Sequence, residues 1–70
     1  MKNTLKESRA LLNMTQEDLA KAAQVSRQTI HAIESSKYIP STLLALKLAK
    51  IFKVPVESLF QLEDSDHLED

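Results

Sequence analysis

The sequence contains no cysteine, no glycine and no tryptophan, and only two prolines among its 70 residues. Without cysteine the chain can form neither a disulfide framework nor a thiolate metal site, and two isolated histidines cannot complete a zinc shell. We therefore expect no metal and no other cofactor. The absence of glycine also means that a turn with a positive φ angle must use a residue that carries a side chain.

A long apolar run is missing as well. The most apolar stretch, residues 41–52, is interrupted by Lys47 and Lys50, and no long uncharged segment follows Lys2. These features predict a soluble cytoplasmic protein with no membrane partner. A chain of this length forms one domain that buries only about 60% of its unfolded surface, so little room is left for a catalytic cleft.

Charge is distributed unevenly along the chain. Residues 1–62 carry nine basic and five acidic side chains, whereas residues 63–70 carry five acidic ones. The first region is therefore expected to be the folded domain, with a mildly basic surface that suits phosphate groups. The acidic tail is expected to be a solvated, frayed terminus, with an interaction segment as the alternative.

Apolar residues recur at spacings of three and four, and no segment alternates convincingly over strand length, which predicts an all-α chain of five helices. The first segment is expected at about residues 3–12 and the fourth is expected to end near Phe52. The short fifth begins near Val56. Side chains that can cap the first four helices stand at Asn3, Thr15, Ser26 and Ser41.

The same periodicity predicts which side chains face the core. The inward positions are expected to be Leu5, Ser8, Arg9, Leu12, Leu19, Ala20, Ala23, Ile30, Ile33, Leu44, Ala45, Leu48, Phe52, Leu59 and Phe60. The third helix then turns a mostly uncharged polar face outward, made of Arg27, Gln28, His31, Ala32 and Ser35. Two short helices joined by a tight turn over residues 15–35 have the layout of a helix-turn-helix, whose second helix enters the major groove of DNA.

Several segments carry a family resemblance. Residues 15–20 (TQEDLA), residues 25–30 (VSRQTI), Ile33-Glu34, Pro40 and residues 46–49 closely resemble the Cro/C1-type (XRE) helix-turn-helix family. The likeness extends from about Leu5 to Phe60. It implies a compact lambda-repressor-like fold and a sequence-specific DNA-binding transcriptional regulator of bacterial or phage type, which we expect to be a repressor.

The resemblance also implies roles for individual residues. Gln16 is expected to bind a phosphate and to steady Arg27, the first reader of the recognition helix. Arg27 has two alternatives, a bidentate contact to guanine or a phosphate contact, whereas Gln28 suits adenine and Ala32 a thymine methyl group. A solvated glutamine remains the alternative for Gln16 and Gln28.

Further DNA contacts are expected around these residues. His31 lies one turn beyond Arg27 and is either a DNA contact or a solvated side chain. Ser26 is expected to contact DNA as well as to cap the helix, and Thr29 is either a contact to a backbone phosphate or an ordinary helical threonine. The following loop, with Ser36, Lys37 and Tyr38, is expected to lie along the sugar-phosphate backbone, with Lys37 and Tyr38 as phosphate ligands.

Arg9 and Glu34 are expected to form a structural pair. The family resemblance pairs these positions, and an inward guanidinium is best satisfied by a carboxylate at the end of the recognition helix. The chain departs from the family at four positions where glycine is usual, namely Asn13, Gln24, Ser36 and Lys53. We expect either turns of altered shape or a cost on the order of 1 kcal/mol at each of the three residues other than asparagine.

A homodimer on a palindromic operator is expected, because one recognition helix covers only a few base pairs. Val56, Leu59, Phe60 and Leu62 are the predicted dimer contacts, with closure of a monomer core as the alternative. Residues 60–62 alternate and allow a short C-terminal strand that pairs across a two-fold axis.

A different class of function is an antitoxin or adaptor module that binds a protein partner. The acidic tail and Leu43, an apolar residue at an expected exposed position, favour it. An enzyme is not expected, because His31 and His67 lie on a polar helix face and in the tail, with no cleft that excludes water.

Overall fold

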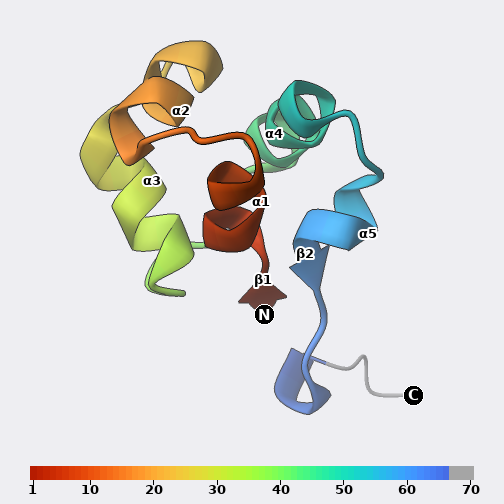
Figure 1. Ribbon diagram of the computed structural model, residues 1–70. Coiled ribbons are helices and arrows are strands. Elements are labelled where there is room, and N and C mark those ends of the chain that lie inside the picture. The colour runs from red at the N-terminus through yellow and green to blue at the C-terminus, as the bar shows by residue number, and fades with distance from the viewer. Residues whose placement is uncertain (67–70) are drawn as a thin grey trace.

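The computed structural model describes residues 1–66 and contains five helices and two short strands in that range (Figure 1). The expected all-α architecture with a short C-terminal strand is confirmed. Within these residues no helix is long and apolar enough to cross a membrane. The elements are β1 (Lys2–Asn3), α1 (Leu5–Leu11), α2 (Gln16–Ala23), α3 (Arg27–Glu34), α4 (Thr42–Phe52), α5 (Val56–Leu59), β2 (Phe60–Gln61) and the 3-10 turn η1 (Asp64–Asp66).

Three of the four predicted caps are confirmed. The side-chain oxygens of Thr15, Ser26 and Ser41 each accept a bond from a backbone amide in the first turn of the helix that follows. The first cap is different, because α1 begins after Thr4 and Asn3 lies in β1. Asn3 still serves the helix start, since its Oδ1 accepts a bond of 3.2 Å from the backbone amide of Leu5.

One core holds the helices together, and α1 lies between the α2–α3 pair and the α4–α5 side of the molecule (Figure 1). The buried side chains of this core are Leu5, Leu19, Ala20, Ala23, Ile30, Ile33, Leu44, Leu48, Ala49 and Leu59. Leu12 was expected to face inward but is 54% exposed, because α1 ends at Leu11 and the helical periodicity stops with it. Ala49 is a core residue that the sequence pattern missed.

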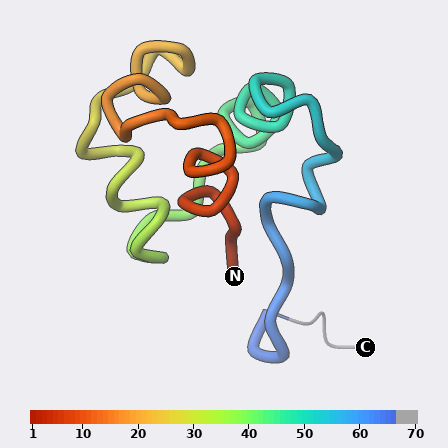
Figure 2. Tube along the Cα trace, viewed as in Figure 1, coloured from red at the N-terminus to blue at the C-terminus, as the bar shows by residue number. Residues whose placement is uncertain are grey.

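The short sheet joins the two ends of the folded region. β1 and β2 are antiparallel, with Lys2 opposite Gln61 and Asn3 opposite Phe60. The expected strand is therefore present, but its partner is the N-terminal segment of the same chain, to which the chain returns after α5 (Figure 2). β1 thus occupies one edge of β2, and pairing of β2 with a second copy across a two-fold axis stays a prediction.

The start of the acidic segment is ordered against the amino terminus. The ammonium group of Met1 lies 2.9 Å from Oε1 of Glu63 and 2.8 Å from Oδ2 of Asp66. The hydrogen bonds that this ammonium group donates to the carboxylates of Asp66 and Glu63 raise its pKa. Residues 63–66 are thus not the frayed tail that was expected, and the remaining tail positions, His67, Leu68, Glu69 and Asp70, lie outside the described residues.

The four glycine-like positions keep the geometry that glycine favours. The φ angles are 56° at Asn13, 61° at Gln24, 59° at Ser36 and 57° at Lys53. Gln24 and Lys53 follow α2 and α4, where their amides bond to carbonyls of the last helical turn. The turns are therefore not reshaped, and side chains occupy left-handed positions instead.

Candidate nucleic-acid interface

Helices α2 and α3 form a tight pair joined by residues 24–26 (Figure 1). The left-handed Gln24 ends α2, and the amide of Val25 bonds to the carbonyl of Ala20 at 3.0 Å. Ser26 then begins α3 through its 3.1 Å bond from the amide of Thr29. This sequence of a stop, a bend and a cap produces the helix-turn-helix that the spacing of residues 15–35 predicted.

The outer face of α3 is exposed as expected. Arg27, Gln28, His31 and Ser35 are exposed and Ala32 is half-buried, whereas Ile30 and Ile33 are fully buried. Burial of the two isoleucines fixes the rotation of the helix about its axis. The polar side chains are therefore presented together, on a helix that is itself held against the core.

The hydroxyl groups at the start of α3 are engaged with each other. The Oγ of Ser26 and the Oγ1 of Thr29 are 2.9 Å apart, and the Ser26 oxygen also caps the helix. Both hydroxyl groups retain hydrogen-bonding capacity, because each has one donor and two acceptor lone pairs. Any contact from Ser26 or Thr29 to DNA stays a prediction.

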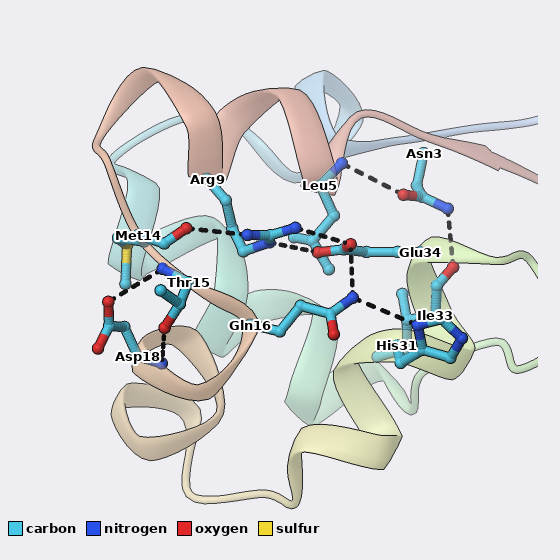
Figure 3. Close-up of polar contacts among 10 residues, drawn as sticks. All are labelled: Asn3, Leu5, Arg9, Met14, Thr15, Gln16, Asp18, His31, Ile33 and Glu34. Atoms are coloured by element: carbon cyan, nitrogen blue, oxygen red, sulfur yellow. Dashed lines mark hydrogen bonds and ion pairs between the residues drawn. The ribbon is translucent and has the colours of Figure 1, made fainter.

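Arg9 and Glu34 form a bidentate ion pair between α1 and the last residue of α3 (Figure 3). Nε of Arg9 lies 2.6 Å from Oε2 of Glu34, and Nη2 lies 3.1 Å from Oε1. The guanidinium also donates from Nη1 to the carbonyl of Met14 at 2.8 Å. The two side chains are 14% and 5% exposed, so the paired carboxylate and guanidinium tie the end of α3 to α1 away from solvent.

The environment of Glu34 favours its charged form. Burial alone raises the pKa of this carboxyl group, but the hydrogen bonds from Arg9 and Gln16 outweigh it and lower the pKa below its ordinary value. The same bond and charge raise the pKa of Arg9. Both partners are ionised at neutral pH.

Gln16 contacts α3 at a different place from the one expected. Its amide nitrogen donates to Oε1 of Glu34 at 3.1 Å and lies 3.4 Å from Nδ1 of His31 (Figure 3). The expected support of Arg27 is replaced by support of His31 and Glu34, because Glu34 supplies a carboxylate within reach of the amide. Gln16 and Arg27 still line one shallow depression, together with Arg9, Met14, Thr15 and Glu17.

The loop after α3 carries the remaining predicted contacts. Ser36, Lys37 and Tyr38 are all exposed, with Tyr38 at 47%. The left-handed Ser36 reverses the chain, and the amides of Ser36 and Lys37 bond back to the carbonyls of Ile33 and Ala32 at 3.0 and 2.9 Å. The loop thus leaves α3 on a defined path, with its side chains free to meet a ligand.

Asn3, for which the sequence predicts only a capping role, also supports the end of α3. Its Nδ2 donates to the carbonyl of Ile33 at 2.9 Å, while its Oδ1 accepts from Leu5 (Figure 3). One side chain therefore bonds the end of α3 and the start of α1. No local pattern signals this contact, because its two partners are 30 residues apart in sequence.

The predicted dimer residues lie in different surroundings. Val56 and Phe60 are half-buried and line an apolar groove, and Leu62 is 66% exposed beside Lys2. Leu59 has no exposed surface and offers none to a second copy, because it closes the chain's own core. The groove also has lining residues that were not predicted, namely Met1, Ile39, Pro40, Thr42, Ala45, Leu46 and Glu57.

Comparison with known proteins agrees with this geometry. An uncharacterized HTH-type transcriptional regulator, MJ0272 of Methanocaldococcus jannaschii, is 61% identical over 94% of this chain and its own full length. The uncharacterized HTH-type transcriptional regulator YgzD of Bacillus subtilis is 47% identical over the same share of the chain and also its full length.

A solved structure has the same fold. The restriction-modification controller protein C.AhdI from Aeromonas hydrophila superposes with a TM-score of 0.74 at 28% identity, covering 80% of this chain and 85% of that one. The family of helix-turn-helix proteins matches residues 5–59, a span that contains α1 to α5. Its members are DNA-binding regulators and not enzymes. The chain therefore belongs to the helix-turn-helix family of transcriptional regulators.

Proposed function

We propose that the protein is a sequence-specific repressor that places α3 in the major groove of an operator. The outer face of α3 carries this proposal, because exposed polar side chains alternate there with isoleucines that are fully buried. A major groove about 12 Å wide admits one α-helix, and its base edges offer hydrogen-bonding patterns that such side chains can discriminate.

Three residues of α3 suit contacts to bases. Arg27 matches the two acceptors of guanine or, alternatively, a phosphate, and Gln28 matches the acceptor and donor of adenine. Ala32 is small and half-buried, which suits contact with a thymine methyl group. Ser26 and Thr29, at the start of α3, are proposed to contact the sugar-phosphate backbone of the DNA beside these base contacts.

The loop after α3 is proposed to bind phosphate. Lys37 and Tyr38 are exposed next to the end of the recognition helix, and Ser36 precedes them. Phosphate contacts supply affinity that depends on salt but not on base sequence. Lys37→Ala should therefore weaken binding to selected and random duplexes by similar factors and lower the slope of affinity against salt by about one unit. A loss restricted to the selected duplex, with an unchanged slope, would make Lys37 a base contact.

A second copy of the chain is the proposed partner. The groove between α4 and α5 joins Val56 and Phe60 to Ile39 and Leu46, which are 64% and 54% exposed. A symmetric pair of copies would cover this surface in both protomers and set two recognition helices on a palindrome, with half-site centres about 34 Å apart. The exposed Leu43 would suit a different protein as partner equally well. The mass of the free protein in solution distinguishes these alternatives, because only a homodimer has twice the mass of the chain.

Selection of duplexes from a random pool tests the function. The protein should enrich two inverted half-sites about 10 base pairs apart, and a reporter gene with that site across its promoter should be transcribed less when the protein is present. Recovery of unenriched DNA would contradict sequence-specific binding. Increased transcription from a promoter that carries the site would contradict repression while leaving recognition intact.

A further inference from the structure

A chain of polar contacts runs from α1 through Glu34 to the outer face of α3 (Figure 3). Glu34 is held ionised by Arg9, and an ionised carboxylate can only accept hydrogen bonds. The atom of Gln16 that lies 3.1 Å from its Oε1 must therefore be the amide nitrogen. This contact fixes which way the amide of Gln16 is turned.

The same amide nitrogen faces the imidazole of His31. It lies 3.4 Å from Nδ1, and an amide NH₂ group has two donors and no acceptor to offer. One hydrogen serves Glu34 and the other is directed at His31, so Nδ1 must act as the acceptor. A neutral imidazole whose Nδ1 accepts carries its proton on Nε2.

We propose that Gln16 is a positioning residue that holds neutral His31 in the Nε2–H tautomer, so that α3 presents a fixed hydrogen-bond donor to DNA. This inference rests on the proposed function. The donor selects acceptors, namely guanine O6 or N7, thymine O4 or a phosphate oxygen. It excludes the amino groups of adenine and cytosine, which the opposite tautomer would favour. Gln16 thereby influences specificity without touching a base.

The tautomer can be measured without DNA. Long-range ¹H–¹⁵N spectra at pH 8, where an ordinary histidine is neutral, should show a protonated Nε2 and an unprotonated Nδ1 for His31. His31→Gln identifies the signals. Gln16→Ala should give a mixture of tautomers, and Gln16→Glu should move the proton to Nδ1, because a carboxylate there can only accept. A parent spectrum with Nδ1 protonated, or with equal tautomers, overturns the proposal even if a variant fails to fold.

A matched control lies next in the sequence. Glu17 is exposed in the same first turn of α2, and Glu17→Ala should leave the His31 signals unchanged. A change of tautomer in this variant as large as that in Gln16→Ala would show that any disturbance of the α2 terminus moves the proton, and would overturn the specific role of Gln16.

Binding to the selected duplex tests the consequence. Gln16→Ala and His31→Ala should each weaken binding about threefold to tenfold, as expected for one hydrogen bond, and the double variant should bind like His31→Ala alone. A fully additive loss would overturn the coupling. An equal loss of affinity for random DNA would identify a phosphate as the acceptor. A loss of affinity confined to the selected duplex would identify a base as the acceptor. If the parent binds no duplex, the proposed function fails, while the tautomer in the free protein is decided separately.

Discussion

Helices α3 and α4 bury one face each but differ in what they present on the other. α3 buries Ile30 and Ile33 and exposes polar side chains, whereas α4 buries Leu44, Leu48 and Ala49 and exposes Leu43 and Leu46, at 71% and 54%. The exposed leucines of α4 suit the proposed contact with another protein, whereas the polar face of α3 suits the donor and acceptor pattern of a base edge.

The two helices also differ in how they are held. The last residue of α3 is tied to α1 by the ion pair of Arg9 and Glu34, and Asn3 bonds the carbonyl of Ile33. α4 is capped by Ser41, and its Lys47 donates an exposed hydrogen bond of 3.2 Å to Oε1 of Gln24 at the end of α2; its other contacts with the core are apolar. The part-buried directional bonds of α3 restrict its position more narrowly than apolar packing and one exposed bond restrict that of α4, which suits the proposed role of α3 in contacting bases.

The largest effect is expected where the support of α3 is removed. Glu34→Ala leaves the guanidinium of Arg9 largely buried without its carboxylate, and the free energy of unfolding should fall by about 3 kcal/mol. A chain of this size would lose on the order of 10 to 20 °C in Tm. Denaturant and thermal unfolding, followed by circular dichroism, measure the loss of free energy and of Tm. Glu7→Ala removes an exposed acid of α1 and should change stability little; an equal loss in both variants would contradict the role of the pair.

Acid sensitivity provides a second measure of the same variant. The pKa of Glu34 is lowered in the folded state, so the unfolded chain takes up the proton more readily. The stability that this carboxylate contributes is present above its ordinary pKa, about 4.3, and is lost as the pH falls through the lower folded value. The difference between parent and Glu34→Ala should therefore shrink in acid. A difference that stays constant below pH 4 would show that the pair contributes little through its charge.

The outer face of α3 is expected to affect binding and not folding. Gln28→Ala should weaken binding to the selected operator by about 1 to 3 kcal/mol and relax one or two base preferences, with an unchanged Tm, because Gln28 is exposed. Titrations with parent and variant measure the loss. An operator whose adenine is replaced by a purine without N6 is the control: the parent should lose affinity on it and the variant should not. Equal affinity of parent and variant for the intact operator would contradict the assignment of α3.

The outer face of α4 is expected to affect association of two copies of the chain. Leu46→Glu places a charge in the groove of both copies and removes the apolar surface that this exposed leucine would bury in the dimer, which should weaken association by about 2 kcal/mol, or roughly thirtyfold. Sedimentation should detect a smaller species at concentrations where the parent is a dimer. Leu11→Glu is the matched control, because Leu11 is 84% exposed on α1 and does not line the groove. A parent that sediments as a monomer at all concentrations would contradict the dimer.

Local signals in the sequence account for most of the fold. Capping residues and apolar spacing predicted the starts of α2, α3 and α4 and the burial of Leu19, Ile30 and Leu48, because each depends on residues within one or two turns. What the sequence did not show was long-range. The pairing of β1 with β2 and the bond from Asn3 to Ile33 join segments about 30 to 60 residues apart, and no short pattern records them.

In the candidate site, too, some features could be predicted from the sequence and others could not. Exposure of Arg27, Gln28 and His31 follows from helical periodicity, and the pairing of Arg9 with Glu34 followed from a family resemblance. The partners of Gln16 could not be predicted from the sequence. Whether its side chain bonds to Arg27 or to His31 depends on side-chain positions that only the tertiary structure fixes.

The smallest effect is expected at the turns without glycine. Lys53 has a φ angle of 57° at the end of α4, where a side chain costs about 1 to 2 kcal/mol and glycine costs none. Lys53→Gly relieves that cost but gives the unfolded chain more freedom, so a net gain of about 0.5 to 1 kcal/mol is expected. Lys53→Ala keeps a Cβ atom and should gain nothing. Lys50→Gly, in the last turn of the same helix, should lose about 1 kcal/mol. Denaturant unfolding of all three measures the differences, and a Lys53→Gly variant no more stable than Lys53→Ala would show that the left-handed lysine carries no cost.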